Sequence, residues 1–209
     1  MLDVIEIFHS IQGESTRAGL PCAFVRLAGC NLHCRYCDTQ YAREEGTRRA
    51  VEDVVAQVHA LGVPLTEITG GEPLLQAQTP ELAELLADLG HTVLVETNGT
   101  VPLPKERRFH TIIDWKTPGS GHQDSFHRRN LPRLREGDEI KFVVCDRADF
   151  DWAVERLGAI PPRIPVLFSP ASTLPSPRLL ARWILDARIH VRLQIQIHKV
   201  LWPDAARGV

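Results

Sequence analysis

Residues 23–39 read AFVRLAGCNLHCRYCDT, and this stretch decides the interpretation of the chain. Its first five residues form an apolar run that predicts a buried β-strand over residues 23–27. The strand leads into a loop in which Cys30, Cys34 and Cys37 follow the spacing Cys-x3-Cys-x2-Cys. Three clustered thiols, in a chain that shows no export signal, indicate a metal or redox site rather than a disulfide framework.

The residues of this loop leave three interpretations open. A structural zinc site normally closes with four Cys or His ligands, and the fourth would have to be His33, Cys22 or a remote residue. His33 adjoins Cys34, so both side chains would struggle to reach one metal. A 4Fe–4S cluster with one open iron needs only three thiolates. The spacing by itself is also compatible with coincidence.

Apolar runs and helical patterns alternate outward from this loop along most of the chain. Strands are predicted over residues 4–8, 23–27, 65–69, 92–96, 110–114, 139–144, 164–168 and 191–197. Helices are predicted over residues 51–61, from an N-cap at Thr79, from a cap at Asp146 through residue 157, and over 179–187 after Ser176-Pro177.

This alternation predicts an α/β fold with a mostly parallel sheet and right-handed crossovers. A complete eight-fold β/α barrel typically needs about 250 residues. With 209 residues and four good helices, we expect one domain over residues 1–209 that forms an incomplete, open barrel.

Composition excludes several classes of protein. Hydrophobic residues make up 44% of the chain and charged residues 24%, with a net charge of −2. These values are typical of a soluble globular protein and exclude a disordered, collagen-like or strongly basic nucleic-acid-binding chain. The longest charge-free stretch, residues 164–177, is too short to cross a membrane. Asp3 and Glu6 interrupt the N-terminus, so we expect no signal peptide and a cytoplasmic location.

Polar or glycine-rich loops follow five of the predicted strands, at residues 29–39, 70–73, 97–99, 115–121 and 169–171. In a parallel β/α architecture these loops open on one face, which predicts an active-site face. The irregular segment 117–138 carries a basic run at Arg128, Arg129, Arg133 and Arg135. This run is either a solvated surface or an electropositive rim that attracts an anionic substrate.

The cysteine loop resembles the hallmark of the radical S-adenosylmethionine (SAM) superfamily. Within it, the chain resembles the 7-carboxy-7-deazaguanine synthases at residues 8–14, 24–30, 37–39, 69–73, 96–99 and 196–199, which read FHSIQGE, FVRLAGC, CDT, TGGEP, ETNG and QIHK. The chain departs from that family at Ser15, where glycine is usual. It also continues past Pro203 with an extension over residues 204–209.

The resemblance implies a radical SAM enzyme with a 4Fe–4S cluster, S-adenosylmethionine and Mg²⁺ as cofactors. The implied reaction converts 6-carboxy-5,6,7,8-tetrahydropterin to 7-carboxy-7-deazaguanine with loss of ammonia, in queuosine and 7-deazapurine biosynthesis. The resemblance further implies a homodimer and an electron donor such as flavodoxin or ferredoxin, with no nucleic-acid or membrane partner.

The resemblance also assigns site residues. It places the cluster on Cys30, Cys34 and Cys37, and Mg²⁺ on Thr39. The SAM-binding residues would be Tyr36, Asp38, Gly71, Glu72, Asn98, Lys116 and Ser169. The substrate-binding residues would be Ile11, Gln12, Gly13, Glu14, Arg26, Thr69, His198 and Pro203.

Chemistry gives several of these residues a specific role. The Glu72 carboxylate would pair with the ammonium of SAM, and the Arg26 guanidinium with the substrate carboxylate. Each role has a structural alternative. Residues 70–73 would form a tight turn without a ligand, and Thr39 would cap the following segment.

Two other functions fit parts of the sequence. A glycyl-radical activase shares the cluster and the cofactor but acts on a protein partner. A non-catalytic zinc module for RNA would use the same thiols, although the net charge of −2 and only two tyrosines argue against a nucleic-acid surface. The isolated Cys22 and Cys145 are expected to be buried small hydrophobes.

Overall fold

The computed structural model describes residues 1–43, 46–174, 176–204 and 207–208. Within these residues a nine-stranded sheet has the order β3-β1-β2-β4-β5-β6-β7-β8-β9. The strands are β1 (Leu2–Ile11), β2 (Pro21–Leu27), β3 (Thr47–Arg49), β4 (Leu65–Gly70), β5 (Thr92–Thr97), β6 (His110–Asp114), β7 (Glu139–Val144), β8 (Val166–Pro170) and β9 (Arg192–Leu193). From β2 to β9 all neighbours run parallel, while β1 is antiparallel to β2 and β3.

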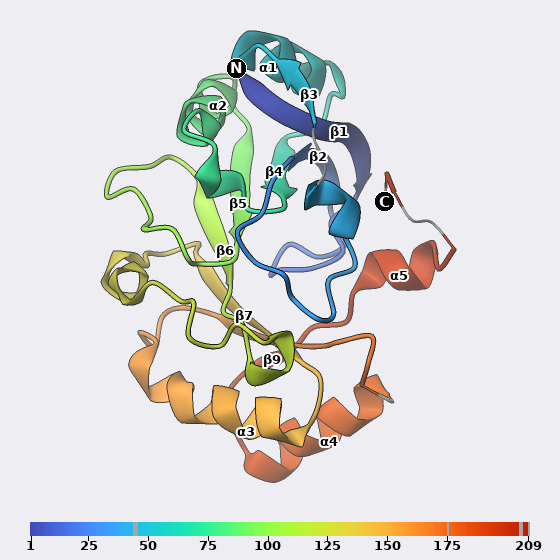
Figure 1. Cartoon of the computed structure of the whole chain (residues 1–209), viewed down its shortest axis with the longest axis vertical. Coiled ribbons are helices and arrows are strands. Elements are labelled where there is room, and N and C mark those ends of the chain that lie inside the picture. Colours follow the sequence, from blue (N-terminus) through green and yellow to red (C-terminus); the bar gives the residue numbers. More distant parts are fainter. Residues whose placement is uncertain (44–45, 175, 205–206, 209) are drawn as a thin grey trace.

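The sheet is open, because β3 and β9 form its two edges in the described part of the chain. The helices are α1 (Val51–Ala60), α2 (Thr79–Asp88), α3 (Arg147–Arg156), α4 (Pro177–Ala187) and α5 (Ile197–Leu201). Figure 1 shows α1 and α2 beside the first strands and α3 and α4 at the opposite end of the sheet. This arrangement confirms the predicted open, mostly parallel β/α barrel. None of the helices in the described residues is long and apolar enough to cross a membrane.

The strand predictions fail mainly at the sheet edges. The predicted strand over residues 191–197 pairs only at Arg192–Leu193, and α5 begins at Ile197. The strand expected at residue 164 starts at Val166, since Pro165 has no N–H to donate to a ladder. Strand β3 was not predicted, because its sequence Thr-Arg-Arg has no apolar alternation.

The helix starts follow their capping signals with one exception. The Asp146 side chain accepts a hydrogen bond from Asp149 N at 2.9 Å, and Ser176 Oγ accepts one from Arg178 N at 3.2 Å, which confirms both predicted caps. Thr79, in contrast, is the first residue of α2 and not its cap. Its hydroxyl donates to Pro73 O at 2.5 Å and so fixes the preceding turn.

Helices cover one face of the sheet with two apolar clusters. In one cluster, Val54 of α1 and Leu82 of α2 pack against the strands of the N-terminal half. In the other, Phe150 of α3 and Leu180 of α4 pack against those of the C-terminal half. Each of these side chains is almost completely buried. Burial of one such side chain stabilises the fold by about 1.5–3 kcal/mol.

The opposite face of the sheet is layered. A small apolar cluster contains Phe24, Leu65, Leu94 and Ile112, from four neighbouring parallel strands. Side chains along a strand alternate between the two faces, so the residue two positions further on points to the same side. In these four strands that residue is Arg26, Glu67, Glu96 and Asp114. A polar layer therefore lies above an apolar one, toward the carboxyl ends of the strands.

Candidate active site

A cavity of about 210 Å³ opens above this polar layer, at the carboxyl ends of β2, β4, β5, β6 and β7. It brings together most of the residues that the sequence predicted. Its lining includes Ile11, Gln12, Gly13, Glu14, Arg26, Cys30, Cys34, Tyr36, Cys37, Asp38, Thr39, Thr69, Gly71, Asn98, Lys116 and His198. Glu72, Ser169 and Pro203 do not belong to this lining.

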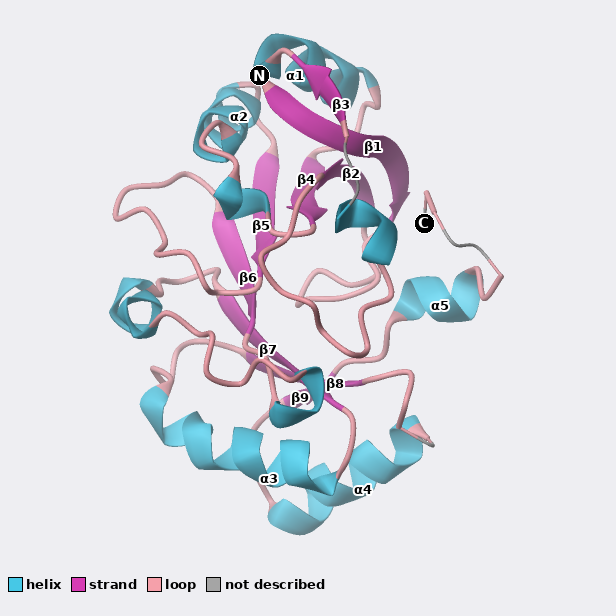
Figure 2. Ribbon diagram, in the orientation of Figure 1, coloured by secondary structure: helices cyan, strands magenta, loops and turns pink. Residues whose placement is uncertain are grey.

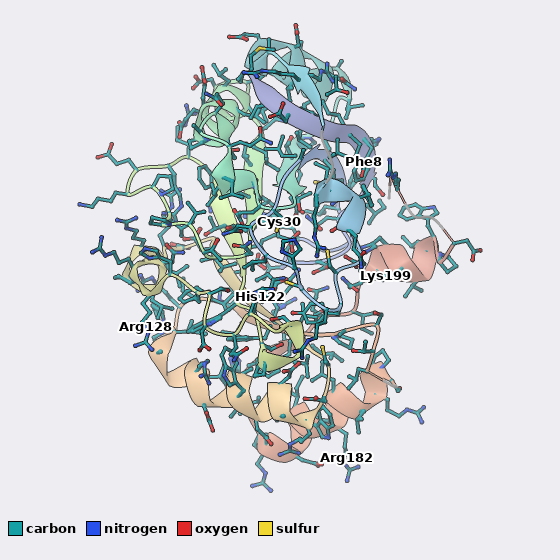
Figure 3. The ribbon with its side chains drawn as sticks, viewed as in Figure 1. Phe8, Cys30, His122, Arg128, Arg182 and Lys199 are labelled. Atoms are coloured by element: carbon teal, nitrogen blue, oxygen red, sulfur yellow. The ribbon has the colours of Figure 1, made fainter. Side chains whose placement is uncertain are left out.

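The loop after β2 places its three thiols on one wall of the cavity. Cys30, Cys34 and Cys37 are free and partly buried, and Cys30 lies at the centre of the molecule in Figure 3. Burial raises the pKa of Cys34, and the neighbouring Cys37 and Cys30 act in the same direction. The three sulfurs therefore lie near enough to influence one another. Within the described residues, no three or more His, Cys, Asp or Glu side chains lie close enough together to bind a single metal ion.

The two candidates for a fourth zinc ligand lie outside the cavity that these thiols line. His33 is exposed, lies outside the cavity lining, and donates its backbone N–H to His122 Nε2 at 3.1 Å. Cys22 is fully buried in the apolar layer, as predicted. Cys145 is only partly buried. A set of three thiols fits a 4Fe–4S cluster with one open iron better than a closed zinc site.

The glycine-rich turn after β4 packs directly on the cluster loop. A Cβ atom at Gly71 would lie 2.1 Å from Gly29 O and 2.8 Å from Cys30 Cβ, so a side chain has no room there. The next N–H, that of Glu72, donates to Gly29 O at 2.8 Å. The turn therefore fixes the start of the cluster loop.

The carboxylate of Glu72 is fully buried and already bonded within the protein. It accepts hydrogen bonds from Leu74 N at 2.9 Å, Asn98 N at 2.6 Å and Thr97 Oγ1 at 2.8 Å. These bonds tie the turn after β4 to the loop after β5. The contact to Asn98 gives Glu72 a positioning role, and its predicted ion pair with SAM stays a prediction.

Two other predicted residues also lie elsewhere. Ser169 is buried within β8, and the cavity is lined instead by Ala171 and Ser172, which follow that strand. Pro203 is exposed just beyond α5. The extension after it is described only at residues 204 and 207–208, so the rest of it lies outside the described residues.

The loop after β1 supplies the opposite wall of the cavity. Gln12 Nε2 donates to Glu67 Oε2, and Gln12 Oε1 accepts from Glu14 N at 3.1 Å. Ser15 has the positive φ of 68° that favours glycine, which explains why glycine is usual there. Its hydroxyl accepts from Arg17 N at 3.0 Å, a local bond that partly offsets the strain.

Lys141 of β7 is the centre of a buried ionic network. Its Nζ lies 2.7 Å from Glu14 Oε2, forms a second ion pair with Glu96, and lies 3.8 Å from Asp114 Oδ2. Burial alone would raise the pKa of Glu14, but Lys141 lowers it to about 2. Burial, together with the charges of Glu96 and Glu14, raises the pKa of Glu67 well above its usual range. At neutral pH Glu14 is therefore ionised, while the environment of Glu67 favours its protonated form.

The C-terminal segment closes one side of the cavity. Ile197 N donates to Gly13 O at 3.0 Å, and Gln196 Nε2 donates to Glu14 Oε1 at 2.6 Å. A Cβ atom at Gly13 would lie 2.1 Å from His198 Nδ1, so only glycine allows the histidine to approach this closely. Burial lowers the pKa of His198, which leaves its ring neutral at pH 7.

Lys199 joins the same segment to the cluster loop. Its Nζ lies 2.5 Å from Asp38 Oδ2, and Figure 3 shows it on the side of α5 that faces the centre of the molecule. Arg26 is also paired before any ligand binds. Its Nε lies 2.7 Å from Glu6 Oε1, and its guanidinium carbon lies 5.7 Å from the ring centroid of Phe8 and 5.8 Å from that of Tyr41.

Sequence reasoning missed the charged residues inside the strands. Glu67, Glu96, Asp114 and Lys141 all line the cavity, and each lies within a predicted strand. The available signal was a charged residue in a strand that is covered on both faces, where such residues are rare unless they are paired.

The basic run of residues 128–135 lies outside the described cavity lining. Arg133 donates to Leu103 O and Arg135 to Phe109 O at 2.9 Å, while Arg128 and Arg129 are exposed. These contacts favour the interpretation as solvated and structural arginines over that of an electropositive rim.

Known proteins are similar to this chain in sequence and in fold. Residues 25–116 match the family pattern of the Radical SAM superfamily. The chain is 45% identical to the 7-carboxy-7-deazaguanine synthase of Chlorobaculum tepidum, over all of this chain and 97% of that one. It is 40% identical to the synthase of Koribacter versatilis over the full length of both.

Among solved structures, QueE from Escherichia coli has the same fold, with a TM-score of 0.75 at 23% identity over 93% of each chain. The full-length sequence identities, together with the three cysteines on the wall of one cavity, identify the relationship. The chain belongs to the 7-carboxy-7-deazaguanine synthase family of the radical SAM superfamily.

Proposed function

We propose that this protein converts 6-carboxy-5,6,7,8-tetrahydropterin to 7-carboxy-7-deazaguanine with loss of ammonia. The relatives are named for this product. The observation that carries the proposal is one cavity lined both by three thiols and by hydrogen-bonding side chains such as Gln12, Glu14 and His198. Such a cavity suits a polar, carboxylated heterocycle held beside a redox centre.

The radical SAM superfamily uses a 4Fe–4S cluster and S-adenosylmethionine, and Cys30, Cys34 and Cys37 are the residues that would hold the cluster. When bound, these two groups supply the radical that starts the reaction. Asn98 lies beside the cluster loop, since its Nδ2 donates to Asn31 Oδ1 at 3.0 Å. Its position supports a role for Asn98 in orienting SAM.

The opposite wall offers donors and acceptors for the edge of a pterin. The raised pKa of Glu67 favours a protonated carboxyl group that can donate a hydrogen bond. An ionised Glu14 can only accept, and the neutral ring of His198 can do either. Lys141 keeps Glu14 ionised, and Gln12 holds Glu67 in place. These protonation states set a fixed pattern that a substrate must match.

Thr39 is the proposed protein ligand of Mg²⁺. It lines the same cavity, and its Oγ1 lies 3.9 Å from Cys37 Sγ, on the side where the substrate would lie. In the described residues 40–43 no backbone N–H donates to this hydroxyl, which favours a metal ligand over a cap. Mg²⁺ usually keeps several waters, so one protein hydroxyl plus substrate oxygens is a suitable ligand set.

The proposal also includes two partners, an electron donor and a second copy of the chain. The reaction needs a one-electron donor such as flavodoxin or ferredoxin, and we expect a homodimer. These partners, and a cytoplasmic location, remain predictions of the family resemblance. Light scattering of the purified protein would measure its oligomeric state.

Anaerobic turnover tests the proposed function. The holoenzyme, given the carboxylated tetrahydropterin, SAM, Mg²⁺ and a chemical reductant, should release a product with the mass of 7-carboxy-7-deazaguanine, and a Cys30→Ala variant should not. Cleavage of SAM without any change in the pterin would favour a different substrate, such as the protein partner of an activase. A colourless protein that contains zinc and no iron would favour the RNA-binding alternative.

A further inference from the structure

The cations that line the cavity differ in whether they already have an acidic partner. Four of them are paired: Arg26 with Glu6, Lys116 with Asp114, Lys141 with Glu14 and Glu96, and Lys199 with Asp38. Arg43 also lines the cavity, but within the described part of the chain it forms no ion pair. Its Nε is buried and has no hydrogen-bond partner among those residues. Among the described residues, which do not include the adjacent Glu44 and Glu45, no acidic side chain balances the charge of Arg43, and its Nε is an unused donor.

The position of Arg43 is fixed by a short 3-10 turn, η1 (Gln40–Arg43). Ala42 N donates to Thr39 O at 2.9 Å, and Ala42 O accepts from Gly29 N at 2.8 Å, so both ends of the turn are tied to the cluster loop. Tyr41 of the same turn donates to Glu6 Oε1 at 2.9 Å, beside Arg26. In Figure 2 this turn is the short helix between β2 and α5. Arg43 thus lies near Thr39 and Arg26, the residues predicted to hold Mg²⁺ and the substrate carboxylate.

Arg43 is half-buried, and its Nε has no partner among the described residues. Such a guanidinium is complementary to a carboxylate, because its planar N–H groups match the two carboxylate oxygens. The substrate and SAM each carry one carboxylate. The residues proposed to hold SAM, Gly71, Asn98 and Lys116, come from the loops after β4, β5 and β6, whereas Arg43 follows the cluster loop beside Thr39. We propose that Arg43 binds the carboxylate of the substrate and so selects carboxylated pterins. This inference rests on the proposed function, since it presupposes a carboxylated pterin in the cavity.

The role differs from the one predicted for Arg26. The charge of Arg26 is balanced by Glu6 and its guanidinium lies near two aromatic rings, so it is satisfied before the substrate arrives. No acidic side chain among the described residues balances the charge of Arg43, so an anion that enters the cavity can pair with it. A carboxylate has enough lone pairs to be shared between this guanidinium and an ion held at Thr39.

Equilibrium binding to the anaerobic holoenzyme tests the proposal. Three probes are compared: the carboxylated tetrahydropterin, the same pterin without its carboxylate, and SAM. Arg43→Gln should weaken binding of the carboxylated pterin by roughly 10- to 100-fold, the equivalent of one charge-assisted hydrogen bond. Binding of the other two probes should change by less than about twofold. Arg43→Lys should recover part of the loss, since it restores the charge but not the planar fork.

Arg48→Gln is the matched control, because Arg48 is an exposed arginine on the nearby strand β3. It should bind all three probes as the wild type does, and iron content and melting temperature should agree among the variants. Unchanged affinity of Arg43→Gln for the carboxylated pterin overturns the proposal. A variant that binds SAM more weakly but binds the carboxylated pterin normally overturns it as well. If the wild type itself fails to bind the carboxylated pterin, the proposed function is wrong, and the inference about Arg43 is wrong with it.

Discussion

Replacement of Lys141 by methionine is a direct test of the buried ionic network. The Lys141 side chain is only 4% exposed, and its Nζ lies 2.7 Å from Glu14 Oε2 and 3.8 Å from Asp114 Oδ2, with Glu96 as a further partner. Methionine keeps most of the length of the side chain and removes the charge. The carboxylates would then remain buried without a cation, so we expect a large loss of stability.

The pKa of Glu14 sets the scale of this loss. Lys141 and the bonds around it lower that pKa from 4.5 to about 2, against the effect of burial. A shift of this size, at about 1.4 kcal/mol per unit, corresponds to roughly 3 kcal/mol. Removal of one partner from a buried ion pair typically destabilises by about 3–5 kcal/mol. We therefore expect Lys141→Met to lower the free energy of unfolding by about 3–5 kcal/mol at pH 7.

The pH dependence has a defined sign. The folded pKa of Glu14 lies below the unfolded value, so this stabilisation is fully present above about pH 4.5 and is lost as the pH falls toward 2. The difference between the wild type and the Lys141→Met variant should therefore be largest near neutral pH and shrink in acid.

Urea unfolding at pH 7 provides the assay, with a double-mutant cycle that adds Glu14→Gln. The cycle should show a coupling energy of about 1 kcal/mol or more, because the two side chains share one ion pair. Lys105→Met is the control, since Lys105 is exposed and surface substitutions usually change stability by less than about 0.5 kcal/mol. A loss below about 1 kcal/mol for Lys141→Met, or a coupling near zero, would refute the reasoning.

Four further substitutions test other parts of the structure. Cys30→Ala should remove the iron–sulfur absorbance. The control Cys145→Ala should retain it, because Cys145 lies outside the cavity lining. A Cys30→Ala protein with full iron content would contradict the cluster assignment. Thr39→Ala should abolish stimulation of turnover by Mg²⁺ with unchanged stability, whereas a loss of about 1 kcal/mol with Mg²⁺ stimulation intact would indicate a cap. Ser15→Gly should raise the free energy of unfolding by about 1 kcal/mol, because it relieves the positive φ of 68°; a lower melting temperature would count against this. Burial lowers the pKa of His91 below 6.5. The contribution of His91 to stability should therefore be fully present above about pH 6.5 and be lost in more acidic buffer. A His91→Asn variant should show a flatter pH profile of urea midpoints.

Local signals were sufficient for most of the fold. The central strands are short apolar runs bounded by polar loops, and caps such as Asp146 and Ser176 are encoded within three residues of the helix start. The cysteine loop was recognisable because its ligands are adjacent in sequence. These features need no knowledge of distant contacts, so the sequence alone predicted them.

The same local signals could not predict which charged residues pair with one another across the cavity. The bond from Lys141 to Glu14 joins residues 127 positions apart, and the bond from Gln196 to Glu14 spans 182 positions. The motif around Glu72 likewise did not show that its carboxylate accepts hydrogen bonds from backbone N–H groups of the fold. A sequence shows which charges exist but not which of them neutralise one another.

The register of the sheet explains how these distant groups meet. Asp114 of β6 and Lys141 of β7 are paired residues on neighbouring parallel strands, and Arg26 of β2 is paired with Thr69 of β4. A slip of one residue would turn each of these side chains to the helix-covered face, so the hydrophobic cores that fix the register also fix the polar layer. The strands thereby hold the charged groups in place before any ligand binds, which is the arrangement that most effectively stabilises a developing charge.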